Sequence, residues 1–188
     1  AHDLAYADVT FDGYVAPSIM EVQGARDVAI EFNSLSKTFN MTGWRVGMAV
    51  GNSKVIDALT RIKTNLDSGI PQAIQEMAIT ALDDPRDSIE IHNDIYTSRR
   101  DRTVAVLREL GLTLDVPAAS LYVWAKLPDG ESSSADYAGR LIEETGVVVT
   151  PGASYGEFGE GYIRISLTTP DDKLDEALRR LREFATGS

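Results

Sequence analysis

The order of apolar segments along the chain predicts an α/β protein. Short strand-like runs, such as DVAIEF at 27–32 and VGMAV at 46–50, alternate with longer segments whose apolar residues recur at helical spacing. The chain has 188 residues, of which 43% are hydrophobic, so it is long enough for one sizeable core or two small ones. This alternation and this length together favour α/β architecture in two lobes.

Three helices are predicted in the first part of the chain, each with apolar residues three or four positions apart. Their ranges are 53–66, 71–82 and 88–110. We expect Ser53 to cap the first helix, Pro71 to open the second and Gly111 to end the third.

After Gly111 the strand-like runs become more frequent. The predicted strands are 112–116, 120–127, 147–150 and 162–167, and the predicted helices are 134–146 and a last one that Thr169 caps and Pro170 opens. We therefore expect a first domain over 1–100 and a second over 101–188, joined by the long helix. Trp44 and Trp124 are expected in the core.

Composition excludes several classes of function. The formal net charge is −11 and the pI about 4.6, which disfavours binding to nucleic acid or to an anionic membrane. The chain has no cysteine and two histidines, so disulfides, cysteine nucleophiles and a histidine-rich metal site are not expected. No apolar run is long enough to span a bilayer, and no signal peptide is recognisable. We expect a cytoplasmic globular protein without a metal.

The stretch NSLSKTFNMTGWRVGMAVG, at 33–51, carries the strongest chemical signal. A small phosphorylated cofactor needs short hydroxyl donors and one planar, permanently charged fork, which Ser34, Ser36 and Arg45 supply if the chain folds back between them. Lys37 beside them is a candidate nucleophile toward an aldehyde. The residues alone also allow a serine-rich turn with a surface lysine and an arginine at the end of a strand.

The same stretch resembles the cofactor-lysine segment of the class I/II aminotransferases, which are fold type I pyridoxal-phosphate enzymes. That family has serine-x-serine-lysine followed by glycine-x-arginine-x-glycine, found here with Gly43, Arg45 and Gly47 in the second part. The resemblance implies a fold type I large domain with a mainly parallel sheet and flanking helices, and a small α+β C-terminal domain. It also implies that Lys37 forms the Schiff base with pyridoxal 5'-phosphate, and that Ser34, Ser36 and Arg45 hold the phosphate.

Two other segments resemble parts of this family. DLAY, 34 positions before Lys37, matches an aspartate-x-alanine-tyrosine element, which implies that Asp3 pairs with the pyridine nitrogen and Tyr6 donates to the ring oxygen. YIRIS near the C-terminus matches the strand whose arginine receives the substrate carboxylate, a role that falls to Arg164. The preceding PGASYGEFGEG, at 151–161, is expected to close over substrate.

Within the family, the sequence of residues 21–51 and 63–82 is similar to that of the LL-diaminopimelate aminotransferases of lysine biosynthesis. Aspartate, alanine and N-succinyl-diaminopimelate aminotransferases share much of it, and Pro71 stands where the diaminopimelate group commonly has an aromatic residue. The resemblance implies amino transfer between an amino acid (LL-diaminopimelate, aspartate or glutamate) and a 2-oxo acid, in a homodimer.

The resemblance extends over all 188 residues but matches only the C-terminal half of such an enzyme, so we expect the chain to be inactive alone. Two alternatives remain open at the level of sequence. One is the aminotransferase-like domain of a transcription regulator that senses pyridoxal phosphate, and the other is a pyridoxal-phosphate-dependent lyase.

Overall fold

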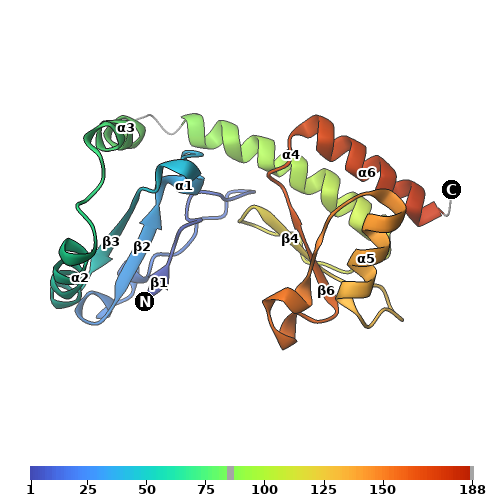
Figure 1. Cartoon of the computed structure of the whole chain (residues 1–188), viewed down its shortest axis with the longest axis horizontal. Coiled ribbons are helices and arrows are strands. Elements are labelled where there is room, and N and C mark those ends of the chain that lie inside the picture. The colour runs from blue at the N-terminus through green and yellow to red at the C-terminus, as the bar shows by residue number, and fades with distance from the viewer. Residues whose placement is uncertain (84–86, 187–188) are drawn as a thin grey trace. The chain divides into compact units, whose positions relative to one another are not determined.

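The computed structural model describes residues 1–83 and 87–186, and it confirms the predicted α/β class (Figure 1). The chain separates into two compact units, Ala1–Asn93 and Asp94–Ser188. The assignment of residues 1–100 to a large cofactor domain and 101–188 to a small domain stays a prediction. None of the helices within the described ranges is long and apolar enough to cross a membrane.

A three-stranded sheet forms the centre of the first unit, in the order β1-β2-β3. Its strands are β1 (His2–Asp3), β2 (Ile30–Ser34) and β3 (Gly47–Gly51). β1 runs parallel to β2, and β3 runs antiparallel to it. A mainly parallel sheet is expected for the whole large domain, and in this unit the parallel pair is β1 and β2. β2 starts three residues later than predicted because Ala25–Asp27 form a 3-10 turn.

Helices α1 (Leu35–Thr38), α2 (Ser53–Leu66) and α3 (Gln72–Asp83) follow the strands of this unit. The prediction that Ser53 caps α2 is wrong. Asn52 is the cap, because its side-chain oxygen accepts a hydrogen bond from the Val55 amide at 3.1 Å. The Asn52 amide group also donates to the Asp27 carbonyl at 2.7 Å, which anchors the start of α2 to the preceding turn.

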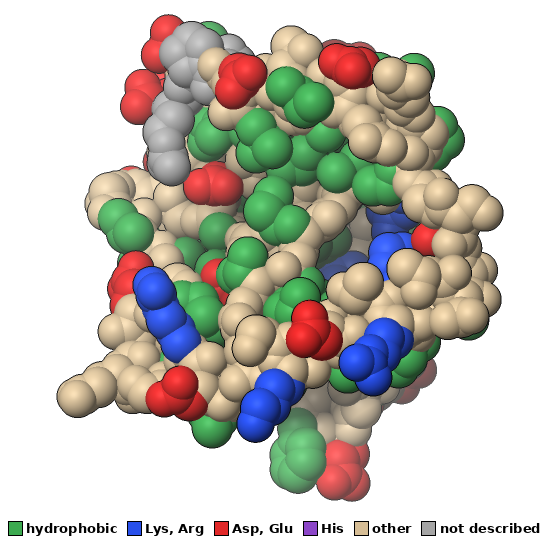
Figure 2. All heavy atoms as spheres, turned by 90° about the vertical axis from the view of Figure 1, so that its left-hand side faces the viewer, with side chains coloured by type: hydrophobic (Ala, Val, Ile, Leu, Met, Phe, Trp, Pro, Cys, Tyr) green, Lys and Arg blue, Asp and Glu red, His purple; other side chains and the backbone are tan. Residues whose placement is uncertain are grey.

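Much of the apolar surface of the first unit faces outward. Large hydrophobic side chains on β3, α2 and α3 are more than a third exposed; they are Met48, Val50, Val55, Ile62, Leu66, Met77, Ile79 and Leu82. Figure 2 views the molecule from the side of α2 and α3 and shows hydrophobic side chains gathered on this face. We call these eight residues the open apolar face. Such a face is unusual for a finished domain.

The second unit has its own antiparallel sheet, in the order β4-β6-β5. Its strands are β4 (Tyr122–Lys126), β5 (Thr150–Pro151) and β6 (Tyr162–Ser166). The predicted strand at 112–116 is wrong, because only Thr113 pairs with Lys126, in an isolated bridge. The predicted strand at 147–150 shrinks to the two residues of β5, one of which is Pro151, whose missing amide limits the ladder.

Helices cover this sheet with a dense core. They are α5 (Ser134–Thr145), α6 (Asp171–Thr186) and the part of α4 (Asp87–Glu109) that belongs to the second unit. Three leucines of α6 are buried in this core, namely Leu174, Leu178 and Leu181. α5 ends where Gly146 adopts the left-handed conformation at φ 71°, as expected for a helix C-cap.

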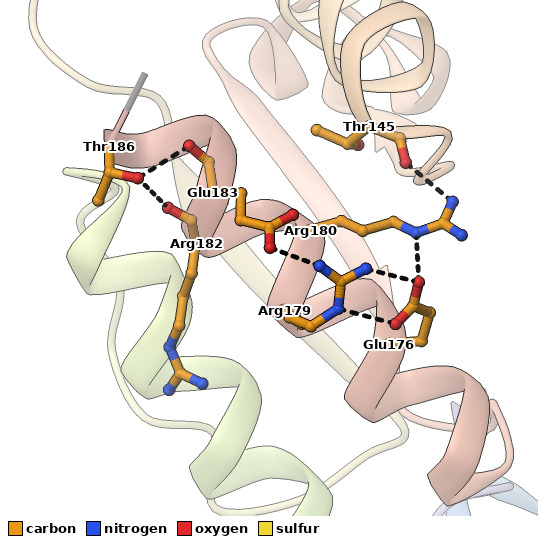
Figure 3. A network of polar contacts seen from close by, with 7 residues as sticks. All are labelled: Thr145, Glu176, Arg179, Arg180, Arg182, Glu183 and Thr186. Atoms are coloured by element: carbon orange, nitrogen blue, oxygen red, sulfur yellow. Dashed lines mark hydrogen bonds and ion pairs between the residues drawn. The ribbon is translucent and has the colours of Figure 1, made fainter. Parts of the chain in front are cut away.

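Ion pairs line the exposed side of α6 (Figure 3). Hydrogen bonds from Arg179 and Arg180 lower the pKa of Glu176 to about 2, and Arg180 also donates to the Thr145 carbonyl at the end of α5. At the start of α6, hydrogen bonds from Arg99 and Arg102 of α4 lower the pKa of Asp171 to about 2. These contacts tie α6 to α4 and α5.

Candidate active site

Lys37 lies one turn after the end of β2. Ser34 closes the strand and caps α1, its hydroxyl accepting from the Ser36 amide at 3.1 Å. The buried side chain of Leu35 anchors the short helix α1, and this helix sets the position of Lys37. Its side chain is half-buried, and its Nζ lies 5.8 Å from the centroid of the Tyr6 ring. The structure therefore brings Lys37 and Tyr6 together.

Ser34, Ser36 and Arg45 also lie close together, because the chain folds back between them. The Thr42 hydroxyl donates to the Ser36 carbonyl at 3.0 Å, and Arg45 Nη1 donates to the Thr42 carbonyl at 3.1 Å. Arg45 itself has φ 57°, the left-handed conformation, which turns the chain into β3. Ser34 then pairs with Gly47 across the two strands. Their assignment to a phosphate stays a prediction.

Asp3 lies on β1, whose place beside β2 depends on a buried acid. Glu31 is 4% exposed, and its carboxylate accepts from Ser18, the Ile19 amide and Asn33 and contacts His2 Nδ1 at 2.9 Å. Burial would raise the pKa of Glu31, but the hydrogen bonds outweigh it and the pKa is lowered.

Asp3 pairs with Phe32 in the register that this cluster sets, and among the described residues its exposed carboxylate accepts one hydrogen bond, a long one from the Ala5 amide at 3.3 Å. The carboxylate of Asp3 thus keeps most of its hydrogen-bonding capacity for a ligand. Its pairing with a ring nitrogen stays a prediction.

Arg164 belongs to the second unit, where it lies on β6 opposite Trp124 of β4. Its guanidinium carbon is 4.0 Å from the centroid of the Tyr122 ring and 4.7 Å from that of Tyr155. A cavity of about 540 Å³ opens in front of it, lined by Tyr122, Trp124 and Tyr162 among others.

Lys37 and Arg164 share a property that sets them apart from the other cations. Among residues 1–83 and 87–186, several lysines and arginines lack a carboxylate within 4 Å, and all of these except Lys37 and Arg164 are exposed. Withdrawing a cation from water without pairing it to an acid costs free energy. The chain has a net charge of −11, so acids are abundant and could have supplied such partners. This property singles out one residue in each unit.

A large cavity of the first unit lies elsewhere. Its volume is about 780 Å³, and it is lined by Met48 of β3 and by Ile56, Leu59 and Lys63 of α2 among others, but not by Lys37. It opens beside the open apolar face. A smaller cavity of about 260 Å³ is lined in part by Ser34 and Asp8.

Sequence reasoning missed three residues that shape these sites. Glu31 was visible as an acid inside an apolar strand, a pattern that indicates a paired buried carboxylate. Tyr122 and Tyr155 beside Arg164 gave no distinctive signal. The expectation that Trp44 and Trp124 are core residues is wrong: they are 43% and 38% exposed, and Trp124 instead stacks on Tyr162 at 5.6 Å.

Comparison with known proteins fixes the family. The family described as "Aminotransferase class I and II" matches residues 1–181. The chain belongs to the class I and II aminotransferases. The "LL-diaminopimelate aminotransferase" of Dehalococcoides mccartyi is 56% identical over 183 residues, which are 97% of this chain and 47% of the relative. The protein of the same name from Halothermothrix orenii is 54% identical over 182 residues, 97% of this chain and 46% of the relative.

A solved aminotransferase from Staphylococcus aureus is 42% identical, with a TM-score of 0.89 over 98% of this chain and 49% of that one. This confirms the fold type I prediction. The chain thus spans about half the length of the aminotransferases that it matches. These three proteins are all named as aminotransferases, so neither the regulator nor the lyase alternative gains support.

The class I and II aminotransferases use pyridoxal phosphate, and the donors of this chain suit that group. The cofactor needs an amine for its aldehyde, anion-binding donors for its phosphate, and an acid for its ring nitrogen. Lys37 is a half-buried amine with no carboxylate within 4 Å among residues 1–83 and 87–186. Ser34, Ser36 and Arg45 converge through the bonds to Thr42 and across β2 and β3. Asp3 carries an open carboxylate. The residues therefore fit the cofactor.

Proposed function

We propose that this chain is the cofactor-lysine part of a pyridoxal-phosphate-dependent aminotransferase, with LL-diaminopimelate as the amino donor and a 2-oxo acid as the acceptor. The observation that carries the proposal is that Lys37 and Arg164 are half-buried cations with no acid partner in the part of the chain that the structure describes. One supplies an amine and the other a carboxylate-binding fork. The names of the relatives at 54–56% identity supply the substrate.

When bound, pyridoxal phosphate supplies an electron sink for the substrate carbon. Lys37 supplies the amine that attaches the cofactor, and its Nζ holds and delivers a proton when it is free. Ser34, Ser36 and Arg45 bind the phosphate, Arg45 as a permanent charge. Asp3 stabilises positive charge on the ring nitrogen, and Tyr6, in contact with Lys37, donates to the ring oxygen.

Arg164 binds the α-carboxylate of the amino acid. A guanidinium fork fits a carboxylate with two parallel hydrogen bonds, so it fixes the orientation of the substrate as well as its affinity. A lysine at this position would bind the charge without the orientation.

We further propose that these 188 residues are inactive alone. The chain spans about half of each relative, and the open apolar face and the large cavity beside it give the first unit an unfinished surface. A half-built pocket loses the preorganisation on which cofactor affinity depends. A homodimer and a cytoplasmic location stay predictions.

A trapping experiment tests the role of Lys37 without requiring turnover. The chain is mixed with pyridoxal phosphate, reduced with borohydride, digested and mapped by mass spectrometry. We expect the pyridoxyl group on Lys37 far more than on the exposed Lys54 and Lys63. Lys37→Ala is the control, and Lys54→Ala is its matched counterpart on an exposed lysine. Equal labelling of all lysines refutes the assignment.

A fusion tests the substrate. Residues 1–188 are joined to the N-terminal half of the Dehalococcoides mccartyi relative, so that both halves of the site are present. We expect this fusion to transaminate LL-diaminopimelate with a kcat/KM at least about tenfold above that for aspartate or alanine, as expected when one extra recognised group adds ~1.4 kcal/mol. A folded, cofactor-loaded fusion that prefers aspartate contradicts the proposed substrate.

A further inference from the structure

The guanidinium of Arg164 lies against two tyrosine rings rather than against an acid. Its central carbon is 4.0 Å from the Tyr122 centroid and 4.7 Å from the Tyr155 centroid, and no carboxylate lies within ion-pair distance among the described residues. A half-buried cation needs compensation for lost water, and aromatic faces provide it.

Tyr122 owes its place to the register of the sheet. Trp124 is directly opposite Arg164, and Tyr122 lies two residues along β4 on the same face. A diagonal neighbour of this kind is within reach of a long side chain on the adjacent strand. Val123 and Ala125, which alternate with them, are fully buried and fix β4 against the core.

The position of Tyr155 is set by the closely packed loop at 152–159. Tyr155 ends the 3-10 turn Gly152–Tyr155, whose backbone packs against Gly159. A Cβ atom on Gly152 would lie 2.0 Å from the Gly159 carbonyl oxygen, and one on Gly159 would lie 2.1 Å from that of Gly152. Only glycine permits this approach at either position.

A hydrogen bond and a ring contact hold the same loop. The Ala153 amide donates to the buried Ser134 hydroxyl at 3.2 Å, and Trp124 meets Tyr155 edge-on at 5.6 Å. These contacts hold the Tyr155 ring, which is 48% exposed, beside Trp124 and Arg164.

We propose that Tyr122 and Tyr155 are positioning residues that hold the Arg164 guanidinium between their rings and leave its N–H groups open to a carboxylate. The carboxylate is that of the proposed function, on which this part of the inference rests. An acid partner would also hold the guanidinium, but it would occupy the N–H groups that substrate needs. Aromatic rings attract the cation without occupying its N–H groups, which stay available to a carboxylate in the cavity that Arg164 lines.

Nuclear magnetic resonance of the 188-residue chain labelled with ¹⁵N-arginine tests the clamp. Protons held over aromatic rings are shifted upfield, so the Arg164 side-chain signals, assigned by their loss in Arg164→Lys, are expected far from those of exposed Arg26 and Arg61. Tyr122→Phe and Tyr155→Phe keep a ring and are expected to keep the shift. Tyr122→Leu and Tyr155→Leu are expected to reduce it.

Titration with L-glutamate then tests the purpose of the clamp. We expect each leucine variant to raise the dissociation constant about five- to tenfold, the loss expected for one ring contact on a cation, and each phenylalanine variant to restore it. Tyr14→Leu is the matched control, because Tyr14 is a tyrosine of the first unit that is 43% exposed and does not line the cavity in front of Arg164. Backbone amide spectra verify that every variant is folded.

Three results are decisive. Unshifted Arg164 signals in the unsubstituted chain overturn the clamp, and so do folded leucine variants that bind glutamate as tightly as the unsubstituted chain. If the Arg164 signals are shifted but the unsubstituted chain does not bind glutamate, the carboxylate role of the proposed function is refuted. In that case a loss of the shift in the leucine variants still supports the clamp.

Discussion

The two units differ most in where their apolar side chains lie. In the second unit, sixteen buried hydrophobic residues form one cluster, and Val106, Val123 and Ile163 within it are fully buried. In the first unit, Leu35, Met41 and Ala78 form a cluster of three, and the open apolar face lies outside it. Arg164 therefore lies in a unit with a large buried core. Lys37 lies in a unit where many large apolar side chains are exposed and could be covered by further protein surface.

The largest expected effect is the loss of activity in the chain alone. We expect no transamination by residues 1–188 at saturating pyridoxal phosphate, because the chain spans about half of each relative and a half-built pocket loses preorganisation. We expect measurable turnover in the fusion with the N-terminal half of the relative. The measurement is a coupled assay of 2-oxo acid formation on both proteins at equal concentration. Lys37→Ala in the fusion sets the background. Equal turnover by the isolated chain and the fusion contradicts the contrast between the units.

The same contrast explains what sequence could predict about the fold. Periodic helices were located within a residue or two, and α2 at 53–66 matched its predicted range, because helical spacing is a local signal. Short strands were less predictable. The run at 112–116 is apolar enough for a strand, but pairing depends on partners far along the chain, and only Thr113 finds one.

For the candidate site, sequence supplied the residues but not their surroundings. Lys37 and Arg45 came from a long pattern and Asp3 from the short DLAY element 34 positions before Lys37, and the structure adds that Thr42 links Ser36 to Arg45. The ring of Tyr155 beside Arg164 was not predictable, because its position depends on tertiary contacts of its loop, among them the Gly152–Gly159 contact and the edge-on contact with Trp124.

Core truncations sharpen the comparison of scaffolds. Leu141, on α5, is 1% exposed, so Leu141→Ala is expected to lower the free energy of unfolding of the second unit by ~2–5 kcal/mol. Ile62, on α2, is 60% exposed, so Ile62→Ala is expected to change stability by about 0.5 kcal/mol or less. Urea unfolding followed by circular dichroism measures both. A cost for Ile62→Ala equal to that for Leu141→Ala would show that the open apolar face is covered in solution.

Removing the Arg164 charge separates the roles of the two units. In the fusion, Arg164→Ala is expected to weaken amino-acid binding by ~1.5–3 kcal/mol, the value of a hydrogen bond to a charged group. Pyridoxyl trapping on Lys37 is expected to be unchanged. Arg164→Lys is the matched control and should recover part of the affinity, because it restores charge without the fork. Loss of trapping with intact substrate affinity would make Arg164 a structural residue.

The smallest expected effect concerns acid stability of the second unit. Hydrogen bonds from Arg99 and Arg102 lower the pKa of Asp171 from 3.8 to about 2. Because the folded-state pKa is depressed, the contribution of Asp171 is complete above pH 3.8 and is lost as the pH falls toward 2. The carboxylate is exposed, so this contribution is small and screened by salt.

The measurement compares thermal unfolding of the unsubstituted chain with that of Asp171→Asn from pH 6 to pH 2 in low salt. We expect the variant to be less stable at pH 6 and the two curves to draw together as the pH falls toward 2, where Asp171 becomes increasingly protonated in the folded state as well. Asp129→Asn serves as the control, since Asp129 is exposed and forms no ion pair among the described residues. A constant difference across the whole range would mean that Asp171 acts through shape or capping at the start of α6 rather than through its charge.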